Sequence, residues 1–271
     1  LPLVLFPLSG GLDLPTTSGS FGHKYVFLYM GGFIIAIAIE KWNLHKRIAL
    51  NIINFIGSDI RKIILGFMMA TAFLSMWISN TATAVMMLPI GIAIIKQLRD
   101  NPDTIEDENL IFGKALMLAI AYSASIGGIS TLIGTPPNLV LAGIVSETYG
   151  YEITFSQWFI FGFPISIILL IICWKYLTRF AFSFKQKEFL GGKEEIKRLL
   201  KTLGKMTYEE KIVAIVFALT AFCWITRSFL LKMILPQIDD TIIAILFALI
   251  LFLIPSKTKH KNIMSWKDTK D

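Results

Sequence analysis

Residues 75–83 read Ser-Met-Trp-Ile-Ser-Asn-Thr-Ala-Thr, and this polar interruption between two apolar runs decides the fold. The runs on either side, 63–78 and 82–95, would reach roughly 21–24 Å as helices, less than a bilayer core of about 30 Å. Backbone groups exposed between them are tolerated at membrane depth only where protein or a wet cavity surrounds them. The sequence therefore predicts a re-entrant helical hairpin over 63–95 that enters from the cytoplasm, turns at 79–81 and returns.

The chain as a whole is too apolar for a water-soluble domain. Of its 271 residues 55% are hydrophobic and 17% charged, with a mean hydropathy of +0.66, whereas soluble domains carry about 25% charged residues. We predict an all-α integral membrane protein. The formal charge of +7 comes from Lys and Arg between apolar stretches, which is typical of cytoplasmic membrane flanks, so no nucleic-acid partner is expected. Four further stretches are long enough to span a bilayer: 21–41, 155–178, 211–231 and 238–254.

The distribution of Lys and Arg predicts the orientation. Residues 175–211 contain ten of them and 257–270 five, whereas the connection 146–153 contains two acids and no base. The positive-inside rule therefore places the first two segments, and the basic segment 41–62, in the cytoplasm and 146–153 outside. An odd number of crossings must then separate residues 62 and 146. A hairpin followed by one crossing satisfies this count, and three full crossings are the alternative.

Segment 41–62 is also amphipathic. Its apolar residues recur at helical intervals, which predicts a helix lying in the membrane interface. A linker helix packed against neighbouring protein is an equal alternative. The residues concerned are Ile48, Ile52, Ile53, Phe55 and Ile56.

A second interruption falls within the apolar segment 114–146. Residues 123–138 read SASIGGISTLIGTPPN and contain three glycines, two prolines and five hydroxyl side chains. A simple kink would need one proline and fewer polar groups, so the pattern favours an unwound transmembrane helix with exposed carbonyls. Two interrupted helical segments of this kind are typical of a midplane binding site in a secondary transporter.

The residue types in the two interruptions predict the ligand. Hydroxyl, amide and carbonyl oxygens at a helix end suit Na⁺, while the N–H groups that open the next helix suit an anion. Helix capping and interhelical hydrogen bonds are the alternative role for these side chains. No Lys, Arg, Asp, Glu or His lies within 63–95 or 115–145, so no proton relay is visible there. An enzyme embedded in the membrane is disfavoured because only Ser and Thr are available, with no base nearby.

In these two stretches, and in GGFIIAIAIEKWNLHKRIAL at 31–50, the chain resembles the divalent anion:sodium symporter family of dicarboxylate, citrate and sulfate carriers. The resemblance implies homodimers whose subunits hold two inverted repeats, each with a re-entrant hairpin and a broken helix, and an elevator-like movement. It implies a Na⁺ site formed by Ser75, Ser79, Asn80 and backbone near Gly128. The substrate residues that it implies are Ser79, Asn80, Thr81, Thr131, Thr135, Pro136 and Asn138.

The same resemblance divides the chain into four parts. They are scaffold spans with an interfacial helix at 1–62, part of the moving transport domain at 63–185, a cytoplasmic amphipathic linker at 186–210, and the first two spans of a second repeat at 211–271. Ser-Asn-Thr occurs once, where the family pattern has two copies. We therefore expect a piece of a longer protein, without a signal peptide and unable to transport by itself.

For the complete protein we expect Na⁺-coupled symport of di- and tricarboxylates such as succinate, malate, fumarate and citrate. Dicarboxylate exchange without Na⁺ coupling and carriage of sulfate or another anion are the alternatives. The expected location is the plasma membrane, crossed several times. The expected partners are a small anionic substrate, Na⁺, lipid and a second copy of the chain.

Overall fold

The computed structural model describes residues 1–57, 59–99, 106–184, 192–258 and 262–269. Within these ranges most residues are helical, and an isolated β bridge joins Pro255 and Asn262. The all-α prediction is confirmed. The helices are α1 Pro2–Leu8, α2 Leu14–Phe21, α3 Lys24–Lys41, α4 Leu44–Ile56, α5 Ile60–Ser75, α6 Asn80–Arg99, α7 Glu106–Ile129, α8 Pro136–Tyr149, α9 Phe155–Lys175, α10 Gly192–Thr202, α11 Tyr208–Thr226, α12 Lys232–Ile234 and α13 Asp240–Leu253, with π-helical turns at Tyr176–Ala181 and Arg227–Leu231.

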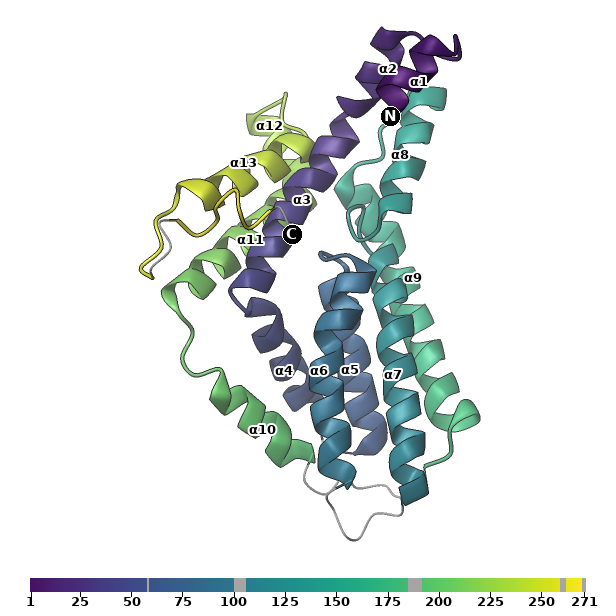
Figure 1. The fold of residues 1–271 in the computed structure, drawn as a ribbon, viewed down its shortest axis with the longest axis vertical. Coiled ribbons are helices and arrows are strands. Elements are labelled where there is room, and N and C mark those ends of the chain that lie inside the picture. Colours follow the sequence, from purple (N-terminus) through teal and green to yellow (C-terminus); the bar gives the residue numbers. More distant parts are fainter. Residues whose placement is uncertain (58, 100–105, 185–191, 259–261, 270–271) are drawn as a thin grey trace.

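The helices form two groups around α3 and α4. Figure 1 shows α5, α6 and α7 side by side in the lower half of the molecule, with α8 continuing upward beyond the end of α7. In the same view α11 and α13 lie on the other side of α3. The most extensive packing joins α5 to α7, α3 to α13, and α4 to α5. One large buried core therefore runs through α5, α6 and α7 and reaches α11 and α13.

Among the described residues, four helical stretches are long and apolar enough to cross a membrane: Leu14–Lys41, Glu108–Ile129, Phe155–Ala181 and Tyr208–Ile234. Three of them contain predicted spans, and the fourth is the first half of the predicted broken helix. The predicted span 238–254 is instead the 14-residue helix α13, which reaches about 21 Å. It is short because the Asp239 carboxylate caps its start, accepting from the backbone N–H of Ile242 at 2.7 Å, and the chain leaves helical geometry at Ile254.

Helix α4 confirms a helix within 41–62 and shows what its two sides do. Ile53 is fully buried, and Gly66 of α5 lets the backbones approach, because a Cβ there would lie 3.1 Å from the Ile53 Cα. Phe55, in contrast, is 91% exposed. The alternative of a helix packed on neighbouring protein therefore describes the buried side, while Phe55 points away from the rest of the structure.

Helices α5 and α6 form the predicted helical hairpin. The Asp59 carboxylate caps α5, accepting from the backbone N–H of Arg61 at 2.8 Å. Helix α6 starts at Asn80 itself and has 20 residues, so it reaches about 30 Å and is longer than predicted. The length of this arm therefore no longer argues against a full crossing. The re-entrant geometry therefore stays a prediction. Its support comes from the contacts between the hairpin tip and the broken helix.

The broken helix is present, but its break is much shorter than predicted. Helix α7 continues through Gly127 and Gly128 to Ile129, and α8 starts at Pro136. Only residues 130–135 of the motif therefore lie outside helices. The two prolines, 136 and 137, lie at the first positions of α8, where a missing N–H costs nothing. Thr135 is extended at φ −152° and ψ 143°, as expected before proline. The sequence thus predicted the interruption correctly and its extent wrongly.

The predicted linker at 186–210 is partly outside the described residues. Its described part contains α10, whose Ile196 is 1% exposed and belongs to the main core. Arg198 pairs with Glu195 one turn earlier at 2.6 Å. The helix is therefore amphipathic, as predicted.

Candidate functional site

Three oxygen atoms meet where the hairpin tip contacts the broken helix. The Ser75 hydroxyl, at the end of α5, lies 2.8 Å from Asn80 Oδ1 and 2.7 Å from the carbonyl oxygen of Ala124 in α7. Ser75 is fully buried. A serine hydroxyl has one proton, so it can donate fully to only one of these two acceptors. These three oxygens are here called the oxygen cluster, and the Ser75 hydroxyl alone cannot satisfy both of the other two.

Two adjacent glycines let the hairpin approach α7 closely enough to form the oxygen cluster. A Cβ at Gly127 would lie 2.3 Å from the carbonyl oxygen of Ala72, and one at Gly128 would lie 2.3 Å from Asn80 Oδ1. Real Cβ atoms do not approach so closely, so any side chain at these positions would push α5 or the tip away. Gly128 therefore acts through the space it leaves for Asn80.

The break at 130–135 is folded tightly and is pinned to the hairpin. The Asn138 side-chain amide donates to the carbonyls of Gly128 at 2.9 Å and Thr131 at 2.8 Å. The Thr131 hydroxyl, fully buried, donates to the carbonyl of Met76 in the tip. Because the carbonyls freed at a helix end need donors, these bonds allow the break to be buried.

Helix α9 satisfies further carbonyls near the end of α7. The indole N–H of Trp158 donates to the carbonyl of Ile129 at 2.9 Å, and the Ser166 hydroxyl donates to that of Ile126 at 2.9 Å. Sequence reasoning assigned α9 to a plain span and missed this role. A polar residue inside an apolar stretch, as at Ser166, was the available signal.

We expect Asn138→Ala to destabilise the protein by about 2–6 kcal/mol, because two buried carbonyls would each lose a donor at ~1–3 kcal/mol. The apparent melting temperature of the purified protein in detergent measures this loss. Thr135→Ala is the matched control, since Thr135 precedes the same helix and makes no side-chain capping bond. Equal losses in both variants would contradict the role given to Asn138.

Four of the predicted site residues lie away from the oxygen cluster. The Ser79 hydroxyl accepts from the backbone N–H of Ala82 at 3.3 Å and lines a cavity of about 520 Å³ beside α3. Thr81 is exposed, and Thr135 is partly buried. The structure thus links Ser75, Asn80, Gly128, Thr131 and Asn138 through side-chain contacts, whereas Thr135 meets Asn138 through its backbone carbonyl, and Ser79 and Thr81 are only chain neighbours of Asn80.

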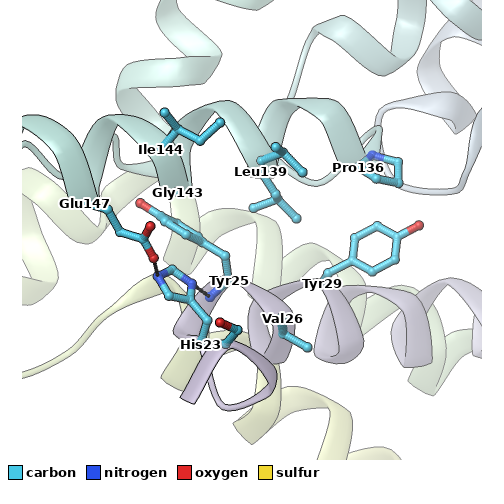
Figure 2. A pocket seen from close by; sticks show the side chains of 11 residues that line it. His23, Tyr25, Val26, Tyr29, Pro136, Leu139, Gly143, Ile144 and Glu147 are labelled. Atoms are coloured by element: carbon cyan, nitrogen blue, oxygen red, sulfur yellow. Dashed lines mark hydrogen bonds and ion pairs between the residues drawn. The ribbon is translucent and has the colours of Figure 1, made fainter. Parts of the chain in front are cut away.

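Pro136 lines a different pocket, between α3 and α8. Figure 2 shows Pro136 at one end of it, near Tyr29, and the pair of His23 and Glu147 at the other. The pocket measures about 380 Å³, and His23 Nε2 lies 3.5 Å from Glu147 Oε1. None of its lining residues belongs to the oxygen cluster.

Sequence reasoning also missed a buried cation inside the predicted span 211–231. Arg227 is 2% exposed, and its guanidinium lies 2.9 Å from Asp240 Oδ2 and 3.2 Å from Glu152 Oε1. A charged residue within an apolar span is a signal of function, and it was available from the sequence.

Comparisons with known proteins agree with this architecture. The family described as the sodium:sulfate symporter transmembrane region matches residues 4–271. A protein of Staphylococcus saprophyticus named sodium-dependent dicarboxylate transporter SdcS is 47% identical over 277 residues, which cover 100% of this chain and 53% of that relative. A protein of the same name from Staphylococcus aureus strain USA300 is 48% identical over the same shares of the two chains. The chain therefore spans about half the length of the curated relatives it matches.

Proposed function

The chain belongs to the sodium:sulfate symporter family, and from this membership we propose that the complete protein is a secondary transporter that couples Na⁺ entry to dicarboxylate uptake. The family consists of transporters and not enzymes. The apolar helices of this chain, together with its family, make it part of a multi-pass plasma-membrane protein. Membership agrees with the resemblance seen in the sequence. The names of the two relatives support sodium as the coupling ion and a dicarboxylate as the substrate.

The oxygen cluster is the observation that carries the Na⁺ part of the proposal. Its three oxygens are uncharged and hard, and Asn80 Oδ1 and the Ala124 carbonyl oxygen lie 2.8 Å and 2.7 Å from Ser75 Oγ. Such ligands suit Na⁺, and in transporters they come from the ends of interrupted helices. On Na⁺ binding the three oxygens would turn lone pairs toward the ion, and the Ser75 hydroxyl would keep its proton.

The start of α6 is the proposed contact for a substrate carboxylate. The Ala82 and Thr83 N–H groups donate to Ser79, so the groups proposed for an anion are the N–H groups of Asn80 and Thr81, where the positive end of the helix dipole favours negative charge. Because Asn80 provides both this backbone and an oxygen of the cluster, Na⁺ binding would fix the residue that meets the substrate. Thr81, exposed beside it, is the next candidate contact. This shared residue is the proposed basis of coupling.

Transport would proceed by movement of residues 63–185 against the remainder of the protein. Helices α5, α6, α7 and α9 pack on one another, which is compatible with their moving as one body, but α4 packs on α5 as closely, so the boundary at residue 62 rests on the family resemblance and not on packing. The remaining parts, 1–62 and 211–271, would belong to the scaffold that forms the homodimer. The second half of the transporter would complete the substrate site.

We expect the complete protein, purified and reconstituted in vesicles, to take up labelled succinate at least about tenfold faster under an inward Na⁺ gradient than under an equal K⁺ gradient. In a coupled symporter, substrate without Na⁺ is bound weakly or is not moved, which is the physical reason for the ratio. Vesicles preloaded with succinate, without any cation gradient, measure exchange in the same preparation. Equal uptake in Na⁺ and K⁺ would remove the symport proposal and leave the exchanger, and preferential uptake of labelled sulfate would change the substrate.

A further inference from the structure

A group of ionic and polar contacts joins α9 and the segment before it to α3, α11 and α13. Arg227, in the π-helical turn after α11, contacts Asp240 of α13 at 2.9 Å and Glu152 at 3.2 Å. Lys24, at the start of α3, lies 3.5 Å from the same carboxylate oxygen of Glu152. We call these four side chains the outer bridge, since the predicted orientation places them near the external face.

The two acids of the outer bridge have different positions relative to the proposed moving part. Asp240 and Arg227 both belong to the α11–α13 hairpin, so their pair would stay intact during any movement of 63–185. Glu152 precedes α9 and belongs to the moving part, whereas Lys24 and Arg227 do not. Glu152 is therefore the acid whose ion pairs cross from the moving part to the scaffold.

Two further hydrogen bonds cross the same boundary. The backbone N–H of Phe155 donates to Asp240 Oδ2 at 2.8 Å, and the hydroxyls of Ser156 and Ser228 lie 2.8 Å apart. A capping box between Thr154 and Gln157 starts α9 at this point and holds the backbone around Glu152 in place. The boundary is thus a defined docking contact between rigid elements.

Exposure indicates that Glu152 can leave and return. The Glu152 and Lys24 side chains are 38% and 36% exposed, so water can solvate both when the contact opens. Arg227 is 2% exposed, and an unpaired buried cation would be costly, but Asp240 remains beside it. Opening the bridge at Glu152 therefore leaves no charge buried without a partner.

We propose that Glu152 is a positioning residue for transport, holding residues 63–185 to the scaffold in the state seen here and releasing Arg227 and Lys24 when that part moves. The inference rests on the proposed elevator-like function. To that function it adds a residue, Glu152, whose ion pairs set the fraction of molecules in the state seen here. A partly exposed ion pair changes such an occupancy by a few fold.

The test uses the complete transporter with Cys173 and Cys223 replaced by Ala and with cysteines at the serine pair, Ser156→Cys and Ser228→Cys. We expect oxidation to join the two cysteines and to stop Na⁺-driven succinate uptake, and reduction to restore it. Uptake that continues at full rate in the cross-linked protein would overturn the inference, because the boundary would then not open. Absence of Na⁺-driven uptake before oxidation would instead count against the proposed function.

The second measurement is the rate of this cross-link when Glu152→Gln is added. We expect cross-linking to slow about three- to fivefold, because loss of the charge lowers the occupancy of the bridged state. Glu194→Gln, an exposed acid of α10, is the matched control and should cross-link at the parent rate. An unchanged rate in Glu152→Gln, or an equal slowing in both variants, would contradict the role of Glu152.

Discussion

Replacing Asn80 by Ala in the complete protein is expected to lower Na⁺-dependent uptake at least about tenfold. Asn80 Oδ1 lies 2.8 Å from Ser75 Oγ and beside Gly128, so the substitution removes one oxygen of the cluster and leaves no nearby group to replace it. An interaction between a polar group and an ion contributes about 1.5–3 kcal/mol, which corresponds to roughly 10–150-fold in Na⁺ affinity. The Na⁺ concentration that gives half-maximal uptake measures the loss.

Ser123→Ala is the matched control for this prediction. Its hydroxyl is also buried, but it donates to the carbonyl of Ala119 within α7 and has no contact with the oxygen cluster. We expect the control to keep the parent's Na⁺ dependence within about twofold. A parent-like Na⁺ dependence in Asn80→Ala would remove this residue from the site.

Gly127→Ala is expected to destabilise the protein by about 3 kcal/mol or more and to lower the yield of folded protein. The added Cβ would lie 2.3 Å from the carbonyl oxygen and 2.6 Å from the Cα of Ala72, and backbone atoms cannot rotate away as a side chain can. Overpacking costs about 1–3 kcal/mol where side chains yield, and more where they cannot. Thermal unfolding of the purified protein, followed by the fraction that stays monodisperse, measures the effect.

The control lies in the same helix. A Cβ at Gly113 would meet only side-chain atoms of Ile95, at 3.6 Å and beyond, which is ordinary contact. Gly113→Ala should therefore keep or raise the melting temperature, since alanine favours a helix by about 1 kcal/mol over glycine. Equal melting temperatures for the two variants would show that α5 and α7 can separate at no cost, contrary to the packing described here.

The sequence was sufficient to predict the hairpin and the broken helix because both depend on where polar residues interrupt apolar runs. It could not predict the extent of the break. Residues 127 and 128 are poor helix formers in isolation, yet they stay helical because Ala72 and Asn80 occupy the space that their missing side chains leave. Such tertiary packing overrides local propensity and leaves no trace in the spacing of residues along one segment.

The site was predictable only in part, for a similar reason. Motifs identified Ser75 and Asn80, but the carbonyl that joins them comes from Ala124, whose side chain carries no information about its backbone oxygen. Ser79 is central to the motif, but its hydroxyl accepts from the backbone N–H of Ala82 at the start of α6. The helix-capping role considered for the hydroxyls of this segment therefore describes Ser79, and the cation-ligand role is proposed for Ser75.

The central claim is that the oxygen cluster binds Na⁺, and equilibrium binding of radioactive Na⁺ to the purified complete protein tests it most directly. The account predicts that Ser75→Ala weakens Na⁺ binding about tenfold or more, whereas Ser79→Ala binds within about twofold of the parent. Parent-like binding in Ser75→Ala together with a loss in Ser79→Ala would contradict it, and would move the sodium ion to the other side of the hairpin tip.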